Sequence, residues 1–148
     1  GWGFSKPDIL LLADCGVAAI DVAGAGGTSW SQVEMYRATD ENQAQLAAAF
    51  TDWGIPTVEA LLTVREVAPQ LLTFASGGLR NGVDIAKCVA LGASLGGLAR
   101  PFLKAASISL ENTIQTIQTI KRQIQVCMFA SGAADLAGLV VERNIETI

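Results

Sequence analysis

The chain has 148 residues, of which 51% are hydrophobic and 16% are charged, and it contains no histidine. This length predicts one domain or a part of one, and the missing imidazoles exclude Ser-His-Asp catalysis, Cys-His catalysis and His-ligated zinc within it. Ten Lys and Arg residues oppose fourteen Asp and Glu residues without forming a basic cluster, so we expect neither nucleic acid nor an anionic membrane surface as a partner.

The low charged fraction predicts that the chain buries surface against a larger body or in an oligomer, since an average domain has about 25% charged residues. Uncharged runs are shorter than the roughly 18 to 20 residues of a membrane-spanning helix, so we expect no membrane segment. The chain starts at Gly1 without a signal region, which indicates a truncated or processed chain. Cys15, Cys88 and Cys127 are odd in number and lack CxxC spacing, which favours a reducing compartment, by default the cytoplasm.

Helical and strand patterns alternate along the chain, and glycines separate them. In chain order they predict a helix over 7–15, a strand over 18–23, helices over 41–53 and 57–67, a strand over 71–76, a helix over 81–91, a strand over 94–99, a helix from residue 100, and a last helix over 109–130. The segment 135–148 shows no clear period and stays unassigned.

This alternation predicts an α/β fold with a parallel sheet, either an open doubly wound sheet or a (β/α)8 barrel. The strands are apolar on both faces, which predicts a sheet that is covered on both sides. Polar, glycine-rich segments follow the first two strands, as the active-face loops of a TIM barrel do. Because three strands cannot close a barrel, we expect residues 1–148 to be a single partial domain, the C-terminal part of a (β/α)8 TIM barrel.

Two loops are candidates for a phosphate site. The segment 76–82 (SGGLRNG) joins a predicted strand to a predicted helix, so its backbone N–H groups, the helix N-terminus and Arg80 are suited to an anion. The segment 97–101 (GLARP) follows the next strand, and consecutive strands of a barrel present their carboxyl ends together. A tight turn without a ligand, and an ion pair of Arg100 at the rim, are the plainer interpretations.

A third loop, 24–30 (GAGGTSW), follows the first strand. Its small residues would let a flat cofactor lie against the backbone, with Thr28 as a hydrogen-bond donor and Trp30 as a wall. A flexible connection is the alternative. Glu34 is either a solvated charge near a helix start or a carboxylate that faces the cofactor. Asp21 is an unusual carboxylate within an apolar strand, and it either bonds to the backbone and closes a loop or has a catalytic role. The sequence contains no metal-ligand cluster.

The segments 21–30 (DVAGAGGTSW), 52–57 (DWGIPT), 76–87 (SGGLRNGVDIAK) and 99–103 (ARPFL) together resemble type 2 isopentenyl-diphosphate Δ-isomerase over about residues 1 to 130. That family has a flavin-dependent (β/α)8 barrel and interconverts isopentenyl diphosphate and dimethylallyl diphosphate. It uses reduced FMN, Mg²⁺, and NADPH to keep the flavin reduced. The resemblance implies that this chain is the C-terminal half of such a barrel.

By this resemblance, Thr28 and the neighbouring Gly27 would contact the flavin region, and Glu34 would match a carboxylate close to the flavin. The phosphate of FMN would be held by Gly77, Gly78, Leu79, Arg80, Ala99 and Arg100. Many relatives carry Ser where this chain has Ala23, so one hydroxyl contact is expected to be missing.

The family's Lys on the preceding strand, its diphosphate-binding residues and its Mg²⁺ ligands would lie upstream of Gly1, so no metal ligand is assigned within this chain. We therefore expect the isolated chain to be inactive and to need the N-terminal half of the barrel, and we expect a homo-oligomer. Two alternatives stay open. One is another FMN-dependent barrel of the hydroxy acid oxidase type, which would need a catalytic His. The other is a non-catalytic, phosphate-binding half-barrel that assembles with partners through its exposed strand edges.

Overall fold

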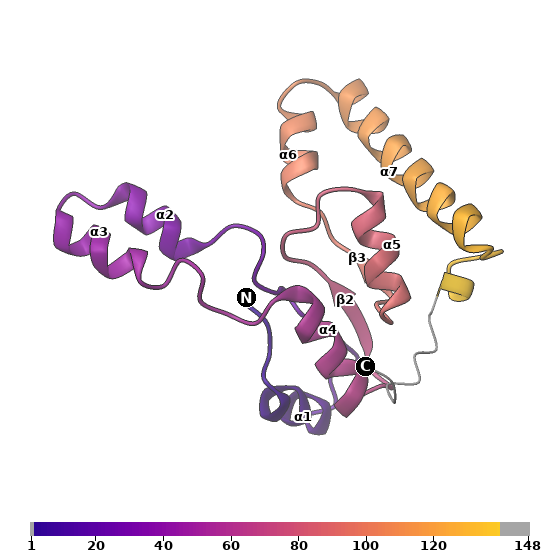
Figure 1. The fold of residues 1–148 in the computed structure, drawn as a ribbon, viewed down its shortest axis with the longest axis horizontal. Helices are drawn as coiled ribbons and strands as arrows, with labels where there is room; N and C mark the ends of the chain where they lie inside the picture. Colours follow the sequence, from indigo (N-terminus) through magenta and orange to yellow (C-terminus); the bar gives the residue numbers. More distant parts are fainter. Residues whose placement is uncertain (1, 140–148) are drawn as a thin grey trace.

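The computed structural model describes residues 2–139, which form a three-stranded sheet and the helices around it (Figure 1). The elements, in chain order, are α1 (Lys6–Asp14), β1 (Ala19–Asp21), α2 (Trp30–Arg37), α3 (Glu41–Ala48), α4 (Thr57–Val67), β2 (Leu72–Ala75), α5 (Gly82–Ala90), β3 (Leu95–Gly96), α6 (Arg100–Ala106), α7 (Leu110–Ser131) and the 3-10 helix η1 (Ala137–Leu139).

The three strands are parallel and lie in the order β1-β2-β3. Ile20 pairs with Thr73, and Phe74 pairs with Leu95. Each strand is followed by at least one helix, and consecutive strands are neighbours, which is the connectivity of a (β/α)8 barrel. The fold is therefore part of a TIM-barrel-like α/β fold, as the sequence predicts.

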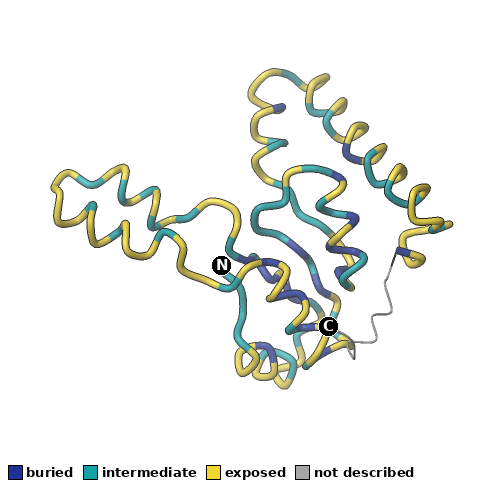
Figure 2. Tube along the Cα trace, viewed as in Figure 1, coloured by how far each residue is buried: buried dark blue, intermediate teal, exposed yellow. Residues whose placement is uncertain are grey.

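Helices cover one face of the sheet within residues 2–139. Ile20 and Ala75 belong to a core that α1, α4 and α5 complete with Ile9, Leu61 and Cys88. Buried stretches of the chain gather on the strands and on the helices beside them (Figure 2). On the opposite face Leu72 and Leu95 are 55% and 52% exposed. The expected cover on both sides is therefore wrong for the described part of the chain. The apolar residues of the open face are those that would line the interior of a barrel, where further strands bury them.

Side-chain caps explain where most helices begin. Ser5 and Asp8 form a capping box at α1, with Pro7 in the first turn. Asn81 accepts a hydrogen bond from the N–H of Asp84 at the start of α5, and Ser109 accepts one from Asn112 at the start of α7. Gly132, with φ +73°, ends α7 in the left-handed conformation. These helices lie within a residue or so of their predicted ranges.

One helix was not predicted, and one is shorter than predicted. The Ser29 hydroxyl accepts a hydrogen bond from the N–H of Gln32 and starts α2, in a segment for which the sequence analysis predicts no helix. The helix expected over 41–53 ends at Ala48. Together α2 and α3 form a hairpin that extends from the body of the molecule, here called the arm (Figure 1).

The long helix α7 packs on α5 and α6. Ile120 of α7 is buried, whereas Ile114, Ile117 and Phe129 on the same helix are exposed. In the tail left unassigned, η1 occupies 137–139, and residues 140–148 lie outside the described residues. Over the described part of the chain, none of the helices combines the length and the apolar character needed to cross a membrane.

Candidate functional site

The loops that follow the three strands meet at one edge of the sheet. The Gly24 N–H donates to the Ser76 carbonyl at 2.9 Å, which ties the loop after β1 to the loop after β2. The Gly97 N–H donates to the Ala75 carbonyl at 2.7 Å, which places the loop after β3 beside them. This is the edge at which barrel enzymes build their sites.

Two glycines allow the first two loops to touch backbone to backbone. Gly77 and Gly78 have φ values of +102° and +84°, in the region that side chains disfavour. A Cβ on Gly77 would collide with the Gly24 carbonyl, and one on Gly78 would lie 2.5 Å from the Gly26 carbonyl oxygen. Only glycine fits at both positions, so the loops present bare backbone at this edge.

Thr57, the first residue of α4, connects both loops. Its hydroxyl lies 2.6 Å from the Gly77 carbonyl oxygen and 3.2 Å from that of Ser76, and its N–H donates to the Ala25 carbonyl at 3.4 Å. Thr57 is buried, and Gly24 packs directly on its backbone. The segment 52–57, known from sequence only as part of a resemblance, therefore has a structural role in joining the loops.

Asp21 is the second connection between the loops. Its carboxylate accepts hydrogen bonds from the Ser76 hydroxyl at 2.7 Å and from the Ala23 N–H at 3.0 Å. Ala23 has a φ of +39°, a strained value for a residue with a side chain. Asp21 thus closes the loop after β1, the plainer of the two roles considered for it.

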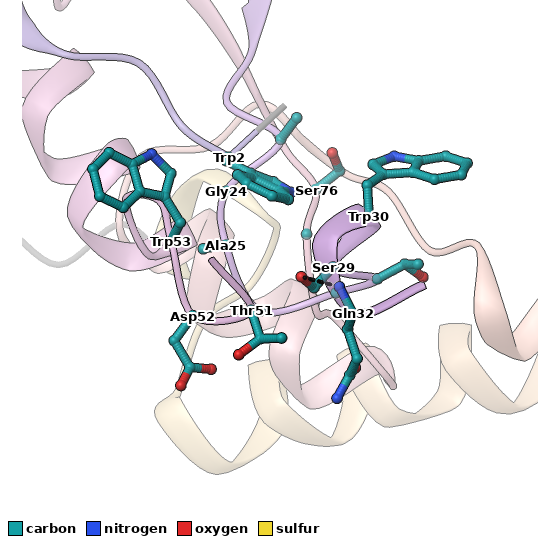
Figure 3. Close-up of a pocket in the computed structure, with 15 residues that line it drawn as sticks. Trp2, Gly24, Ala25, Ser29, Trp30, Gln32, Thr51, Asp52, Trp53 and Ser76 are labelled. Carbon is teal, nitrogen blue, oxygen red and sulfur yellow. Dashed lines mark hydrogen bonds between the residues drawn. The ribbon is translucent and has the colours of Figure 1, made fainter. Parts of the chain in front are cut away.

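A cavity of ≈ 820 Å³ opens beside the joined loops (Figure 3). All three tryptophans of the chain line it, and in the view of Figure 3 Trp2 lies between Trp53 and Trp30. Asp52 and Gln32 supply polar groups. Apolar rings with a few polar side chains against bare backbone are typical of a site for a planar organic ligand.

The cavity contains part of the set of residues that the sequence indicated. Gly27, Thr28 and Gly77 line it, whereas Gly78 lies outside its described lining and packs against Gly26 and Gly27. The other residues lie outside its described lining: Leu79 packs at the edge of the core, Arg80 is exposed beside α5, and Ala99 and Arg100 are exposed at the start of α6.

Glu34 lies apart from this cavity. It lines a second hollow of ≈ 730 Å³ between α2 and α3, together with Arg37, Gln43 and Phe50. Gln32 is the polar residue of α2 that reaches the first cavity. In the described chain, the arm therefore holds the two side chains in different hollows.

Trp2, Thr51 and Asp52 line the cavity although sequence reasoning did not assign them. Trp2 comes to it because its N–H donates to the Ala23 carbonyl at 2.6 Å and its carbonyl accepts from Ile55 at 2.8 Å. The segment 52–57 was the available signal for Asp52, whereas no local pattern marks Trp2.

Within the described residues, no three His, Cys, Asp or Glu side chains are grouped so as to hold a metal ion. Burial and, to a lesser extent, the Asp84 carboxylate raise the pKa of the Cys88 thiol. Cys88 belongs to the core on the helix side of the sheet and stays protonated near neutral pH. It is a structural thiol.

Comparisons with known proteins agree with this geometry. The profile of a family described as FMN-dependent dehydrogenase matches residues 4–145. An isopentenyl-diphosphate delta-isomerase from Stutzerimonas stutzeri is 50% identical over 146 residues, which is 99% of this chain and 42% of that protein. The enzyme of the same name from Xanthobacter autotrophicus is 50% identical over 139 residues, 94% of this chain and 40% of that protein.

Among solved structures, a mutant flavocytochrome b2 with benzoylformate matches with a TM-score of 0.57 and 21% identity, over 98% of this chain and 41% of that chain. This likeness concerns the fold alone. The chain therefore spans well under half the length of the relatives that it matches.

Proposed function

The chain belongs to the FMN-dependent dehydrogenase family, and from this premise we propose that it is the FMN-holding, C-terminal half of the barrel of an isopentenyl-diphosphate delta-isomerase. The supporting observation is the pair of glycine loops joined at the carboxyl ends of β1 and β2 beside a tryptophan-lined cavity. Residues 1–148 would form one partial domain, completed by an N-terminal half.

The residues present fit FMN by two tests. The first is space: a cavity of ≈ 820 Å³ lies beside the loops, and the bare backbone of Gly26, Gly27 and Gly77 forms part of its wall. The second is chemistry: within residues 2–139 the N–H groups of Gly77 and Gly78 meet no acceptor. Unpaired N–H groups beside a helix N-terminus are suited to a phosphate.

We assign Gly77, Gly78, Leu79 and Arg80, with Ala99 and Arg100, to the phosphate of FMN, and Gly27 and Thr28 to the flavin region. When bound, the reduced flavin would supply a ring nitrogen able to exchange a proton, which suits a chain without histidine. The protein's own residues would bind and orient the ligands and exclude water through Trp2, Trp30 and Trp53. Glu34 is proposed as the carboxylate that holds a proton near the flavin, which requires the arm to bring it to the first cavity.

The proposed reaction interconverts isopentenyl diphosphate and dimethylallyl diphosphate in isoprenoid biosynthesis. The reaction would further require Mg²⁺ and NADPH, and the ligands of the metal are assigned to the N-terminal half. The exposed apolar residues Ile117 and Phe129 on α7 support a homo-oligomer. Three cysteines without a disulfide support a cytoplasmic location.

Isomerisation is favoured over the oxidation of a hydroxy acid. Both relatives at 50% identity are named isopentenyl-diphosphate delta-isomerase. The 148 residues contain no histidine to take up the proton that such an oxidation removes.

The experiment is purification of the complete protein that carries this chain, with a measurement of bound flavin by its visible absorbance. We expect Arg80→Ala to weaken FMN binding about tenfold or more, because a charge-assisted hydrogen bond is lost. Lys87→Ala is the matched control, since Lys87 is also an exposed cation on the same loop-helix unit.

Turnover of isopentenyl diphosphate is then followed with reduced FMN and Mg²⁺. Purified protein that takes up no flavin, or an Arg80→Ala variant that binds FMN as the Lys87→Ala variant does, contradicts the proposal. If the protein binds flavin but does not isomerise isopentenyl diphosphate, the proposed FMN site stands and the proposed reaction is wrong.

A further inference from the structure

The orientation of the peptide groups in the Ser76-Gly77-Gly78 loop depends on partners outside the loop. The Gly24 N–H holds the Ser76 carbonyl at 2.9 Å. The Thr57 hydroxyl has one proton, and its nearer acceptor is the Gly77 carbonyl oxygen at 2.6 Å. Within residues 2–139, Thr57 is the one group bonded to that oxygen.

Because Thr57 holds the Gly77 carbonyl, the geometry of the peptide group also fixes the direction of the Gly78 N–H. A trans peptide group is planar, so its C=O and its N–H point in opposite directions. The described chain contains no cis peptide. When Thr57 holds the Gly77 carbonyl on the side of α4, the Gly78 N–H of the same peptide group must point away from α4.

The Ser76–Gly77 peptide is fixed in the same sense. Its carbonyl faces Gly24 and Thr57, so the Gly77 N–H also points away. The two N–H groups are consecutive, meet no acceptor within the described chain, and belong to glycines with φ values of +102° and +84°. Two successive glycines are the most freely rotating backbone available, so without an external bond their peptide groups would reorient.

We propose that Thr57 is a positioning residue: its hydroxyl fixes the Gly77–Gly78 peptide group so that the Gly78 N–H is aimed in advance at the phosphate of the flavin nucleotide. This inference rests on the proposed function, because it concerns the same phosphate site. Thr57 itself does not line the cavity and would not touch the ligand.

The surroundings of Thr57 explain why a hydroxyl at this position acts in so defined a way. Thr57 is 7% exposed, its N–H bonds to the Ala25 carbonyl, and Gly24 packs on its backbone. Its place at the start of α4 therefore cannot shift without moving the loop after β1. A group held this firmly can hold the loop after β2 in turn.

The test uses the apo form of the complete protein and two ligands that differ only in the phosphate, FMN and riboflavin. Thr57→Val keeps the shape of the side chain and removes the hydroxyl, and Thr57→Ser keeps the hydroxyl and removes the methyl group. We expect Thr57→Val to weaken the binding of FMN about tenfold, the scale of one hydrogen bond to a charged group. The affinity for riboflavin should change by less than about twofold. Thr57→Ser should keep the preference for FMN over riboflavin. Flavin fluorescence quenching measures both dissociation constants.

Three results would overturn the inference: equal losses for the two ligands in Thr57→Val, no loss of FMN affinity in Thr57→Val, or a lost FMN preference in Thr57→Ser. If Thr57→Val does not fold, Thr57→Ala, which also lacks the hydroxyl, replaces it in the same comparison with Thr57→Ser. Arg80→Ala separates this inference from the proposed function. If both Arg80→Ala and Thr57→Val keep the preference for FMN over riboflavin, the proposed phosphate site is wrong. If only Arg80→Ala loses that preference, the phosphate site stands and the positioning role of Thr57 is wrong.

Discussion

At the scale of single residues, the glycines of the joined loops carry the strictest requirements. Gly78 has both a positive φ and the Gly26 carbonyl oxygen 2.5 Å from the place of a Cβ. Gly132 has a positive φ of +73° and nothing within 4 Å of its Cβ position. Comparing a substitution at Gly132 with one at Gly78 therefore separates the cost of backbone strain from the cost of a close contact.

We predict that Gly132→Ala lowers the free energy of unfolding by about 1 kcal/mol, the cost of a left-handed alanine. Gly78→Ala should cost at least about 2 kcal/mol more, because one of the two loops must move. Denaturant unfolding of the complete protein measures both values. Equal losses of stability in Gly132→Ala and Gly78→Ala would contradict the prediction, because they would mean that the two loops can move apart at no cost in free energy.

The sequence identified the glycines at this scale but not the residues that hold them. A glycine pair after an apolar strand is a local signal, readable from 76–82 alone. Thr57 and Trp2 act through partners distant in the chain, Gly77 and Ala23, so no local pattern could assign them. Asp21 was noticed only because a carboxylate is unusual in an apolar strand.

At the scale of elements, α7 offers a test of which face is structural. Ile120 is 9% exposed and Ile117 is 51% exposed, on the same helix and with the same side chain. We predict that Ile120→Ala lowers the free energy of unfolding by about 2 to 4 kcal/mol, and that Ile117→Ala lowers it by less than about 1 kcal/mol. Chemical denaturation at low protein concentration is the measurement. An equally large loss at Ile117 under these conditions would contradict the prediction.

The long helices were predictable because their boundaries are local. Helix α4 coincides with its predicted range, and α7 begins after the capping Ser109. The missed helix α2 has no buried residue, so it lacks the apolar period by which amphipathic helices are recognised. It depends instead on the Ser29 cap and on α3 beside it.

At the scale of the whole molecule, the open face of the sheet determines how the isolated chain behaves. Leu72 and Leu95 lie on that face, more than half exposed. Strands at the edges of the described sheet also leave backbone groups available for pairing. Both features favour association with another chain.

We predict that the 148-residue chain, produced alone, elutes larger than a monomer in size-exclusion chromatography with light scattering. With reduced FMN, Mg²⁺ and isopentenyl diphosphate it should show no turnover, because the chain spans only 42% of a relative such as the Stutzerimonas stutzeri enzyme. Measurable turnover would refute the expectation that the N-terminal half is required. The fold class was predictable from alternating patterns, whereas the one-sided cover was not, because apolar residues on both faces look alike whether helices or barrel strands bury them.

The arm also bears on how this kind of chain can change over evolutionary time. A parallel bridge between Ala25 and Pro56 holds together the two ends of the segment that contains α2 and α3. At the same place the Ala25 N–H donates to the Ile55 carbonyl at 2.8 Å. Lengthening a loop whose ends are already held together costs little conformational entropy, about 0.6 kcal/mol for each doubling of its length. Insertions at the tip of the arm, in the turn between α2 and α3, can therefore accumulate between lineages while the register of β1 against β2 and the residues of the first cavity stay intact.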